Sequence, residues 1–398
     1  MSNTPKLRFP EFKGEWKKSE LGKFTQEITR VNPNSDAPIM MISAANGFIL
    51  QSNKYSKEMT GQSLKKYIEL HAGEFAYNHG ASKLKKYGAC FCLDLDKARI
   101  PFVYHCFKLT EGNTKFFSYL LNRTQLDSEL ARYISSSARM DGLLNISYTD
   151  YMKINISVPT LAEQKKIADF LSNVDSIITA ETKILNTLQK KKKALMQKLF
   201  TRQLRFKSDD GTDFPEWEEK KMSDICTVNQ GLQIAIENRL LEKKANCYFY
   251  ITNEFIKTGT KYKYYIENPP KNVLCTKDDI LMTRTGNTGI VVTDIDGCFH
   301  NNFFKINYSR DLVIKGFLVQ FFKLSTTQKR ILVLAGSSTI PDLNHKDFYS
   351  LTIQLPCKAE QQKIADCLSS MDSLIQTQQK VVTTWQQRKK ALLQQMFI

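Results

Sequence analysis

The stretch that comes nearest to an active-site motif is Asn268-Pro269-Pro270-Lys271. Enzymes that methylate the N6 amino group of adenine carry Asn/Asp-Pro-Pro followed by an aromatic residue, whose ring stacks on a base flipped out of the duplex. Here the fourth residue is a lysine, and no glycine-rich cofactor loop follows a strand upstream. We therefore interpret the stretch as a turn and keep a stand-alone adenine-N6 DNA methyltransferase only as an alternative.

Other residues with catalytic or metal-binding chemistry do not group along the chain. Pro341-Asp342 lacks the Glu-x-Lys or Asp-x-Lys spacing of a nuclease, the five histidines have no metal-ligand spacing, and the nine cysteines include no Cys-x-x-Cys. Cys90 and Cys92 alternate along a strand-like run and should face the same side, as reduced thiols of a cytoplasmic protein. The sequence therefore predicts no catalytic residue, no metal site and no cofactor in this chain.

Nucleic-acid contact is the chemistry that the polar residues do offer. Lys and Arg exceed Asp and Glu by 17, and the excess is spread along the chain rather than confined to a tail, which favours polyanions such as DNA. In polar loops between strand-like runs, Asn78 could read adenine, Arg284 could read guanine, and lysines could hold phosphates. The candidate contacts are Asn78, His79, Lys83, Lys85, Lys86, Arg139, Lys261, Lys263, Arg284, Thr285 and Asn287.

Each of these candidates has a structural alternative. The lysines around residues 83–86 also suit a solvated charged hairpin, and Lys261 and Lys263 alternate with tyrosines as in an edge strand protected by charge. Apolar runs are short, such as 331–335, and residues 1–12 hold no apolar core of a signal peptide. We expect no membrane span and no membrane partner.

These loops must be positioned by a domain that occurs twice. Strand-like runs are expected at 38–42, 75–77, 89–93 and 102–109, and again at 248–251, 280–283, 289–293 and 303–307. A helix is expected near 114–135 and another near 313–335, and each half closes with a last strand that runs into a proline. Trp16 and Trp217 open the two halves in similar surroundings. The halves differ mainly in their loops, as two recognition domains for different targets would.

A 42-residue repeat follows each domain. Residues 159–200 align without a gap to residues 356–397, and 22 of the 42 positions are identical. Each copy is expected to form one helix of about 60 Å. Apolar residues recur every 3.5 positions, which marks a coiled-coil seam. The seam residues are Ile167, Leu171, Val174, Ile178, Leu185, Leu188 and Leu195, and in the second copy Ile364, Leu368, Met371, Ile375, Val382, Trp385 and Leu392.

The seam is interrupted and bordered in the same way in both copies. Glu181 and Gln378 break it at one matching place and Lys192 and Lys389 at another, as register markers would. A second apolar row widens the stripe beyond what two helices need, with Phe170, Ile177 and Ile184 in the first copy and Cys367, Leu374 and Val381 in the second. The helices should therefore offer spare apolar surface to partner helices.

With this order of domain, helix, domain, helix, the chain resembles a specificity subunit of a type I restriction–modification system. The resemblance spans essentially the whole chain, and its most specific part is the start of each long helix, AEQKKIADFLS at 162–172 and AEQQKIADCLS at 359–369. It implies two target-recognition domains that each read half of a bipartite DNA site, held apart by antiparallel helices. It also implies methyltransferase partners, two in number, that bring S-adenosylmethionine, and a restriction partner that uses ATP and Mg²⁺.

The expected fold is α+β, with two mixed α/β recognition domains and two long helices that form an antiparallel coiled coil with pseudo-twofold symmetry. The expected domains are 1–157 and 201–354, and the expected helices 158–200 and 355–398. The expected function is a non-catalytic subunit that reads an asymmetric, bipartite site on double-stranded DNA. The alternative to it is an interaction scaffold that binds DNA without sequence preference. The bases that it reads and the length of the spacer do not follow from the sequence.

Overall fold

The computed structural model describes residues 3–53, 62–80, 82, 84–134, 144, 146–258, 263–336 and 340–398. Three candidate DNA contacts, Lys83, Arg139 and Lys261, lie outside these residues. The chain divides into two compact units, residues 1–182 with 380–398, and residues 183–379. Each unit therefore holds one domain, the first half of one long helix and the last half of the other.

In the first unit, the main sheet has four antiparallel strands in the order β2-β9-β6-β7. Its strands are β2 (Thr25–Glu27), β9 (His105–Leu109), β6 (Phe75–Asn78) and β7 (Ala89–Cys92). Two smaller antiparallel pairs accompany it, β3 (Met40–Ser43) with β4 (Gly47–Leu50) and β5 (Ile68–His71) with β8 (Lys97–Ile100). A third pair joins β1 (Lys17–Glu20) to β10 (Asn155–Val158), the last strand before the long helix.

The second unit repeats the order of the main sheet, but its smaller strands join in one four-stranded sheet instead of two separate pairs. Its main sheet has the order β12-β19-β16-β17 and is made of β12 (Cys226–Gln230), β19 (Phe303–Tyr308), β16 (Ile280–Thr283) and β17 (Val291–Val292). Its smaller sheet has the order β14-β13-β18-β15 and is made of β14 (Tyr265–Glu267), β13 (Cys247–Ile251), β18 (Gly297–Phe299) and β15 (Leu274–Cys275). The pair β11 (Glu218–Lys221) with β20 (Thr352–Leu355) matches β1 with β10. The duplication inferred from the helices thus extends to the sheets.

The helix predicted near 114–135 is two helices, α1 (Thr114–Leu120) and α2 (Asp127–Tyr133), joined by the 3-10 turn η4 (Thr124–Leu126). The one predicted near 313–335 is likewise divided into α7 (Lys315–Lys323) and α8 (Ser325–Leu334). The physical reason is local, because Arg123 and Leu324 both adopt extended backbone and side chains with hydroxyls follow them. The prediction of one continuous helix was wrong in both halves.

A short helix precedes the last strand in each unit. These helices are α3 (Tyr148–Met152) and α9 (His345–Tyr349), and each is capped by a side chain that accepts a backbone N–H, Ser147 in the first and Asn344 in the second. The remaining short helices are α5 (Met222–Ile225) and α6 (Asn253–Thr258), with 3-10 turns η1 (Leu21–Phe24), η2 (Gln51–Asn53), η3 (Gln62–Lys66), η5 (Ile236–Asn238) and η6 (Lys271–Val273).

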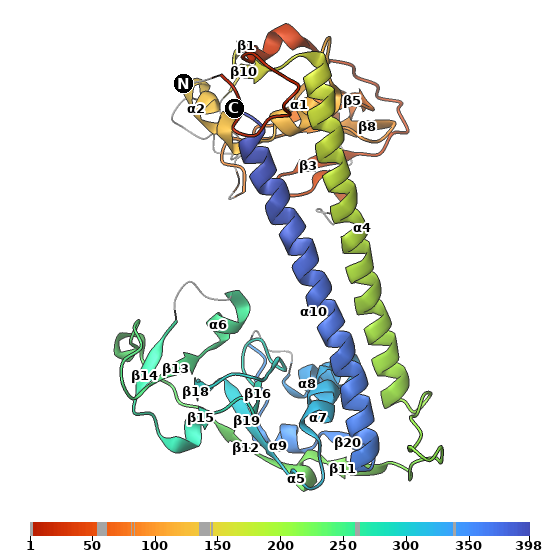
Figure 1. The fold of residues 1–398 in the computed structure, drawn as a ribbon, viewed down its shortest axis with the longest axis vertical. Coiled ribbons are helices and arrows are strands. Elements are labelled where there is room, and N and C mark those ends of the chain that lie inside the picture. Colours follow the sequence, from red (N-terminus) through yellow and green to blue (C-terminus); the bar gives the residue numbers. More distant parts are fainter. Residues whose placement is uncertain are drawn as a thin grey trace. The chain divides into compact units, whose positions relative to one another are not determined.

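The two long helices are α4 (Leu161–Phe200) and α10 (Lys358–Gln395). In the first unit, the beginning of α4 and the end of α10 contribute to one core with the domain, through Ile167, Leu171 and Leu392 (Figure 1). In the second unit, the end of α4 and the beginning of α10 do the same, through Leu199, Ile364 and Leu368. Within each unit the beginning of one helix therefore packs with the end of the other, which is the antiparallel arrangement.

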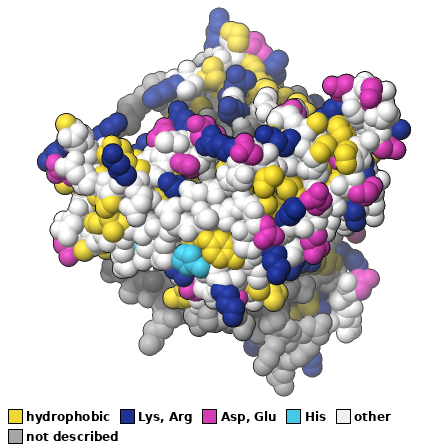
Figure 2. Space-filling view, turned by 90° about the horizontal axis from the view of Figure 1, so that it is seen from below, with side chains coloured by type: hydrophobic (Ala, Val, Ile, Leu, Met, Phe, Trp, Pro, Cys, Tyr) yellow, Lys and Arg dark blue, Asp and Glu magenta, His cyan; other side chains and the backbone are white. Residues whose placement is uncertain are grey.

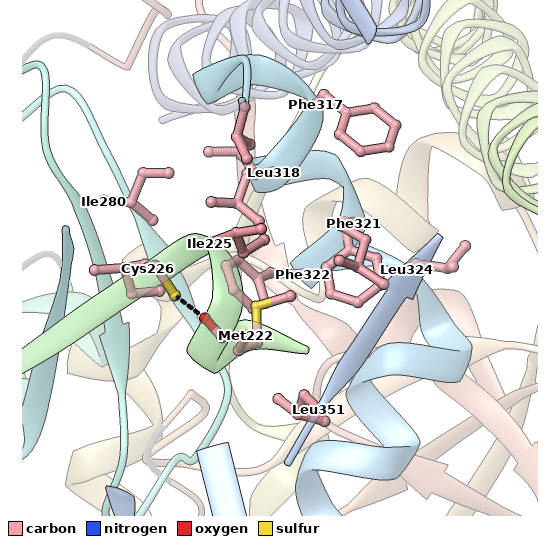
Figure 3. Packing of buried hydrophobic residues seen from close by; sticks show 14 of the residues in the cluster. Met222, Ile225, Cys226, Ile280, Phe317, Leu318, Phe321, Phe322, Leu324 and Leu351 are labelled. Atoms are coloured by element: carbon pink, nitrogen blue, oxygen red, sulfur yellow. Dashed lines mark hydrogen bonds between the residues drawn. The ribbon is translucent and has the colours of Figure 1, made fainter. Parts of the chain in front are cut away.

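The core of the second unit shows how a domain holds its helices. Leu318, Phe321 and Phe322 of α7 pack in the core that includes α5 and the strands of the main sheet (Figure 3). On the other side of α7, Phe317 stacks on Phe200 of α4, with 5.2 Å between ring centroids. Gly316 permits a close approach of α7 to α10, because a Cβ there would lie 2.9 Å from the Cβ of Ala365.

The surface carries mixed charge. On the face shown in Figure 2, Lys and Arg side chains are interspersed with Asp and Glu side chains. Cys90 and Cys92 belong to the same core, as the alternation in their strand predicted. Within the described part of the chain, no helix combines the length and the apolar character needed to span a bilayer.

Candidate nucleic-acid interface and helix seam

In the second unit, the structure joins two loops that are 50 residues or more apart in the sequence. The loop after β16 is tied to the loop before α9 by backbone hydrogen bonds from Gly286 N to Pro341 O, 3.1 Å, and from Leu343 N to Arg284 O, 2.8 Å. The Arg284 guanidinium donates to Asp342 at 2.8 Å and lies 5.4 Å from the centre of the Phe304 ring. Thr285 also donates its hydroxyl to Asp342. Asp342, considered in the sequence as a nuclease residue, therefore orients Arg284.

The first unit has the same junction with different side chains. Leu144 N donates to His79 O at 2.9 Å, and the Nδ1 atom of His79 lies 2.7 Å from Leu144 O. His79 thus occupies the place of Arg284, directly after the strand that leads into the loop. It is buried and stacks on His105 with 5.0 Å between ring centroids. Burial is the main cause that lowers the pKa of His105 below its ordinary value, with the neighbouring His79 adding to it.

The candidate DNA contacts differ in how available their side chains are. Asn78 donates to Ile42 O and accepts from Gly80 N, so its amide is engaged within its own domain. Lys85 is half-buried and donates to Asn122 O, and burial lowers its pKa. Lys86, Lys263 and Asn287 are exposed. The exposed members and the Arg284–Asp342 pair therefore present the polar groups that could meet DNA directly.

The Asn268-Pro269-Pro270-Lys271 stretch is a surface turn. Asn268 has a positive φ of 46° and donates its backbone N–H to Asn246 O, and Lys271 is exposed at the start of η6. Asparagine tolerates this left-handed conformation better than most residues do. The conformation fits the interpretation of the stretch as a turn.

A buried carboxylate near the start of each long helix ties the helix to its domain. Glu163 accepts two hydrogen bonds from Arg8, both 2.8 Å, and one from the indole of Trp16 at 3.2 Å. Glu360 accepts from Arg205 at 3.1 and 3.0 Å and from Trp217 at 2.9 Å. Such paired, charge-assisted bonds fix direction as well as position. They explain why a tryptophan opens each half of the sequence.

The glutamine that follows this glutamate in each repeat also bonds the long helix to its domain. Gln164 accepts from Asn113 N and donates to Pro159 O, both 2.9 Å. Gln361 accepts from Ile314 N and donates to Pro356 O, both 2.8 Å. Sequence reasoning used the Ala-Glu-Gln motif only as a family signature and missed this structural role. The signal was present, since Glu and Gln are identical in the two copies and stand directly before the apolar stripe, in the first turn of each helix.

The predicted seam residues are all buried or half-buried along both helices. The second row is more open, and Phe170, Ile184 and Leu374 are exposed. At the polar interruptions, Lys192 pairs with Asp372 at 2.6 Å and Lys389 pairs with Asp175 at 2.5 Å. Each pair joins α4 to α10 within its own unit, Lys192–Asp372 in the second and Lys389–Asp175 in the first. The two pairs are related by the 197-residue offset of the repeat.

The two aspartates are held from a third side as well. Tyr119 of α1 donates its hydroxyl to Asp175 at 2.7 Å, and Gln320 of α7 donates to Asp372 at 2.9 Å. Burial alone would raise the pKa of Asp372, but the bonds from Lys192 and Gln320 outweigh it and lower the pKa. Each domain is therefore connected to both long helices through one carboxylate.

Comparison with known proteins gives one family throughout. The family model described as "Type I restriction modification DNA specificity domain" matches residues 32–190 and 215–384. Among curated proteins, the chain is 26% identical to the MjaX specificity subunit and 25% identical to the MjaVIII specificity subunit of type I restriction enzymes, both from Methanocaldococcus jannaschii. The alignments cover 70% and 66% of this chain, and 66% and 65% of those relatives' own length.

Two solved structures share the fold. One is the S subunit of a type I restriction–modification system from M. genitalium, with a TM-score of 0.58, 14% identity, and 99% of each chain covered. The other comes from a study of complex assembly and conformational transition of the type I R-M system, with a TM-score of 0.56, 16% identity, and 96% and 97% of the chains covered. At this identity the likeness concerns the fold alone, two mixed domains with a pair of long helices.

Proposed function

This chain belongs to the type I restriction–modification DNA specificity family, and from that premise we propose that it is the subunit that selects the DNA site on which a methyltransferase and a restriction enzyme act. It reads a bipartite, asymmetric sequence on double-stranded DNA, one half-site with each domain. It performs no chemistry of its own.

The observation that carries this proposal is a duplicated scaffold with unlike loops. Both main sheets have the same strand order, and both present a polar junction where the strand β6 or β16 ends. At that junction one unit places His79 and the other Arg284, backed by different neighbours. His79 is buried and bonded within its own domain, whereas Arg284 is half-buried and paired with Asp342. The two units therefore present different polar groups beside the same junction, and different groups would read different bases. The target should accordingly have two different halves rather than a palindrome.

Partners supply the remaining activities. Methyltransferase subunits, two per chain, would bind the helix seam and bring S-adenosylmethionine, and restriction subunits would bring ATP and Mg²⁺. The exposed second apolar row on the long helices, with Phe170, Ile184 and Leu374, supports such binding. The complex would act in the cytoplasm, where the nine cysteines would remain reduced.

A binding selection with the full chain and its methyltransferase partner tests the proposal. Duplexes of random sequence are selected for binding at moderate salt, and the bound sequences are then analysed by footprinting. We expect two short protected tracts of different sequence, separated by a spacer of any sequence. Affinity that falls with salt but shows no preference over random duplex would contradict the proposal, because that is purely electrostatic binding. A single continuous tract would contradict the bipartite site.

Substitution in one loop sharpens the same experiment. Arg284→Ala should relax the preference at one base of one half-site, by about 1–3 kcal/mol for a bidentate contact. The matched control is Arg330→Ala, since Arg330 lies in α8 of the same unit and donates to Thr352 instead. Equal effects of the two substitutions on both half-sites would exclude Arg284 as a base-reading residue.

A further inference from the structure

Two basic cavities occupy equivalent places in the two units. The cavity in the first unit has a volume of about 380 Å³ and lies between the end of α10 and the segment that follows α1. The cavity in the second unit has a volume of about 390 Å³ and lies between the end of α4 and the segment that follows α7. Four long-helix residues of each lining are related by the repeat, Gln386, Lys389, Lys390 and Leu393 in one and Gln189, Lys192, Lys193 and Met196 in the other. Gln394 lines only the first cavity, and Asp372 and Ile375 line only the second.

Both cavities have an excess of positive charge. The first is lined by the cations Lys85, Arg123, Lys389 and Lys390, and no acidic residue stands among the described residues of its lining. The second is lined by Lys192, Lys193 and Lys323, with Asp372 as its one acidic lining residue. The lysines at 389 and 192 are already paired with Asp175 and Asp372. The remaining cations face the cavities without an equal number of carboxylates, so each cavity favours an anion.

The first cavity also holds a donor that lacks a partner. The Nε atom of Arg123 donates to Leu120 O at 3.2 Å, but its Nη1 atom is buried and forms no hydrogen bond with any described residue. Arg123 is only 8% exposed and lies over the ring of Phe397, 4.8 Å from its centre. Burial lowers its pKa to about 10, so the guanidinium stays charged at neutral pH although it is poorly solvated. A buried charge without a compensating partner is costly, and an arriving anion would relieve that cost.

The walls of the cavities are partly apolar. Leu393 and the ring of Tyr119 line the first, and Met196, Leu324 and Ile375 line the second. An anion that is carried on an aliphatic stem, such as the side chain of Asp or Glu, contacts both the apolar wall and the cations. Duplex DNA is less suited, because its phosphates lie on a convex surface that protruding side chains reach. The cavities are built from helices, whereas the candidate reading loops follow strands.

We propose that each cavity receives a carboxylate side chain, Asp or Glu, from one copy of a partner polypeptide, so that two partner copies dock at repeat-related places. The proposal rests on the proposed function in taking the methyltransferase subunit as that partner. The rim lysines Lys390 and Lys193 are exposed and would meet the carboxylate first. Because four lining residues on the long helices, the two pairs of lysines among them, recur with the repeat, the two partners would be bound in a similar way.

The test uses the full chain and the methyltransferase subunit purified together with it. Lys390→Glu and Lys193→Glu reverse one rim charge in each cavity, singly and together. The matched controls are Lys380→Glu and Lys191→Glu, which change exposed lysines on the same two helices that do not line either cavity. Partner affinity and stoichiometry are measured by sedimentation, and thermal unfolding of each variant checks that it folds.

We expect each single reversal to remove one of two bound partner copies, with at least a tenfold loss of affinity at that place, and the double reversal to remove both. Each control should retain two copies. A partner helix in which an acidic residue is changed to lysine should restore binding to Lys390→Glu. The proposal would be overturned if the charge reversals affected partner binding no more than the controls do. It would also be overturned if the reversals weakened binding of a random duplex by the chain alone while partner binding persisted.

A second measurement does not depend on substitution. Acetylation of lysines in the wild-type complex, followed by mass spectrometry, should show Lys193 and Lys390 protected at least fivefold by the partner, with Lys191 and Lys380 unprotected. Equal reactivity of all four with and without the partner would overturn the proposal. Failure of the proposed function would give a different result from failure of this proposal. If the proposed function is wrong, the wild-type complex binds target and random duplex equally, independently of the substitutions and of the lysine protection.

Discussion

At the scale of single residues, one buried carboxylate in each unit decides how the long helix leaves its domain. Glu163 and Glu360 lie at equivalent positions of the repeat, and each joins an arginine and a tryptophan from the segment before the domain. Removing one partner from such a buried pair leaves the other charge uncompensated. The two clusters have the same set of hydrogen bonds, so we expect both to fix the direction in which the long helix leaves its domain.

Glu360→Gln should therefore destabilise the protein by about 3 kcal/mol, within the range for a broken buried pair. The matched control is Glu216→Gln. Glu216 also pairs with Arg205, at 3.0 Å, but its side chain is 80% exposed, so its loss should change stability by less than about 0.5 kcal/mol. Urea unfolding of both variants measures the difference. Equal midpoints would show that the buried carboxylate has no special role.

A pH dependence follows from the stacked histidines of the first unit. The folded pKa of His105 lies below its ordinary value, so at mildly acidic pH the unfolded chain binds a proton that the folded chain does not. Stability from this group is complete above about pH 6.5, the unfolded value, and decreases as pH falls from there toward the folded pKa. The protein should therefore unfold more readily at pH 5.5 than at pH 7.5.

His105→Phe should reduce this pH dependence. The variant loses the hydrogen bond of His105 to Ile146 O, 3.0 Å, and should be less stable by about 1 kcal/mol at pH 7.5, where the histidine is neutral in both states. Its unfolding temperature should then change less between pH 7.5 and 5.5 than that of the wild type. We assign the remaining pH dependence of the unfolding temperature to His300, because burial lowers its pKa as well. The double variant His105→Phe/His300→Phe should therefore show a still smaller change in unfolding temperature between the two pH values. Identical profiles for wild type and variants would contradict this account.

The sequence predicts the candidate contacts in polar loops but not their surroundings, and Asn78 is the last residue of β6. Asn78 and His79 are used by their own domain, because buried amides and imidazoles must find partners and these find backbone carbonyls or N–H groups nearby. No sequence pattern indicates that Leu144 would meet His79 or that Asp342 would meet Arg284. Those contacts depend on how distant loops close over the sheet, which single-sequence periodicity does not describe.

At the scale of elements, the long helices were the most predictable part. The apolar residues of the 3.5-residue stripe are buried or half-buried along α4 and α10, because a continuous helix with such a stripe has few other ways to remove it from water. The helices that follow the sheets were less predictable. Arg123 and Leu324 interrupt them with extended backbone at residues that do not exclude helix by themselves, so tertiary packing decides the break.

The pairs at the polar interruptions of the seam can be measured directly. We expect Lys192 and Asp372 to show a coupling energy of about 1 kcal/mol in a double-mutant cycle with Lys192→Met and Asp372→Asn. This value is lower than that of a fully buried pair because the aspartate side chain is 34% exposed and solvent screens the interaction. The coupling should decrease at high salt. The surface pair Lys220 and Glu218 serves as the control, with side chains 38% and 72% exposed, and should show less than about 0.5 kcal/mol. Equal coupling in the two cycles would remove the idea that these lysines fix the register of the seam.

At the scale of the whole molecule, we propose that the long helices are a spacer between the two DNA-recognition domains. Linking two weak readers on one stiff connection raises their combined affinity and restricts the separations that they accept. Each half of each helix belongs to a different unit, with the divisions after Thr182 and after Gln379. These two positions are equivalent in the repeat, so insertions there lengthen both helices alike and leave each unit's own contacts in place.

The most direct test of the central claim is the spacer that the chain accepts before and after such an insertion. Seven residues, about two turns and 10 Å of helix, are inserted after Thr182 and again after Gln379, keeping the seam in register. Binding selection on duplexes with varied spacers should then show the same two half-sites, with the preferred spacer longer by about three base pairs at 3.4 Å each. An unchanged spacer with both half-sites retained would contradict the claim that the paired helices set the distance between the two readers.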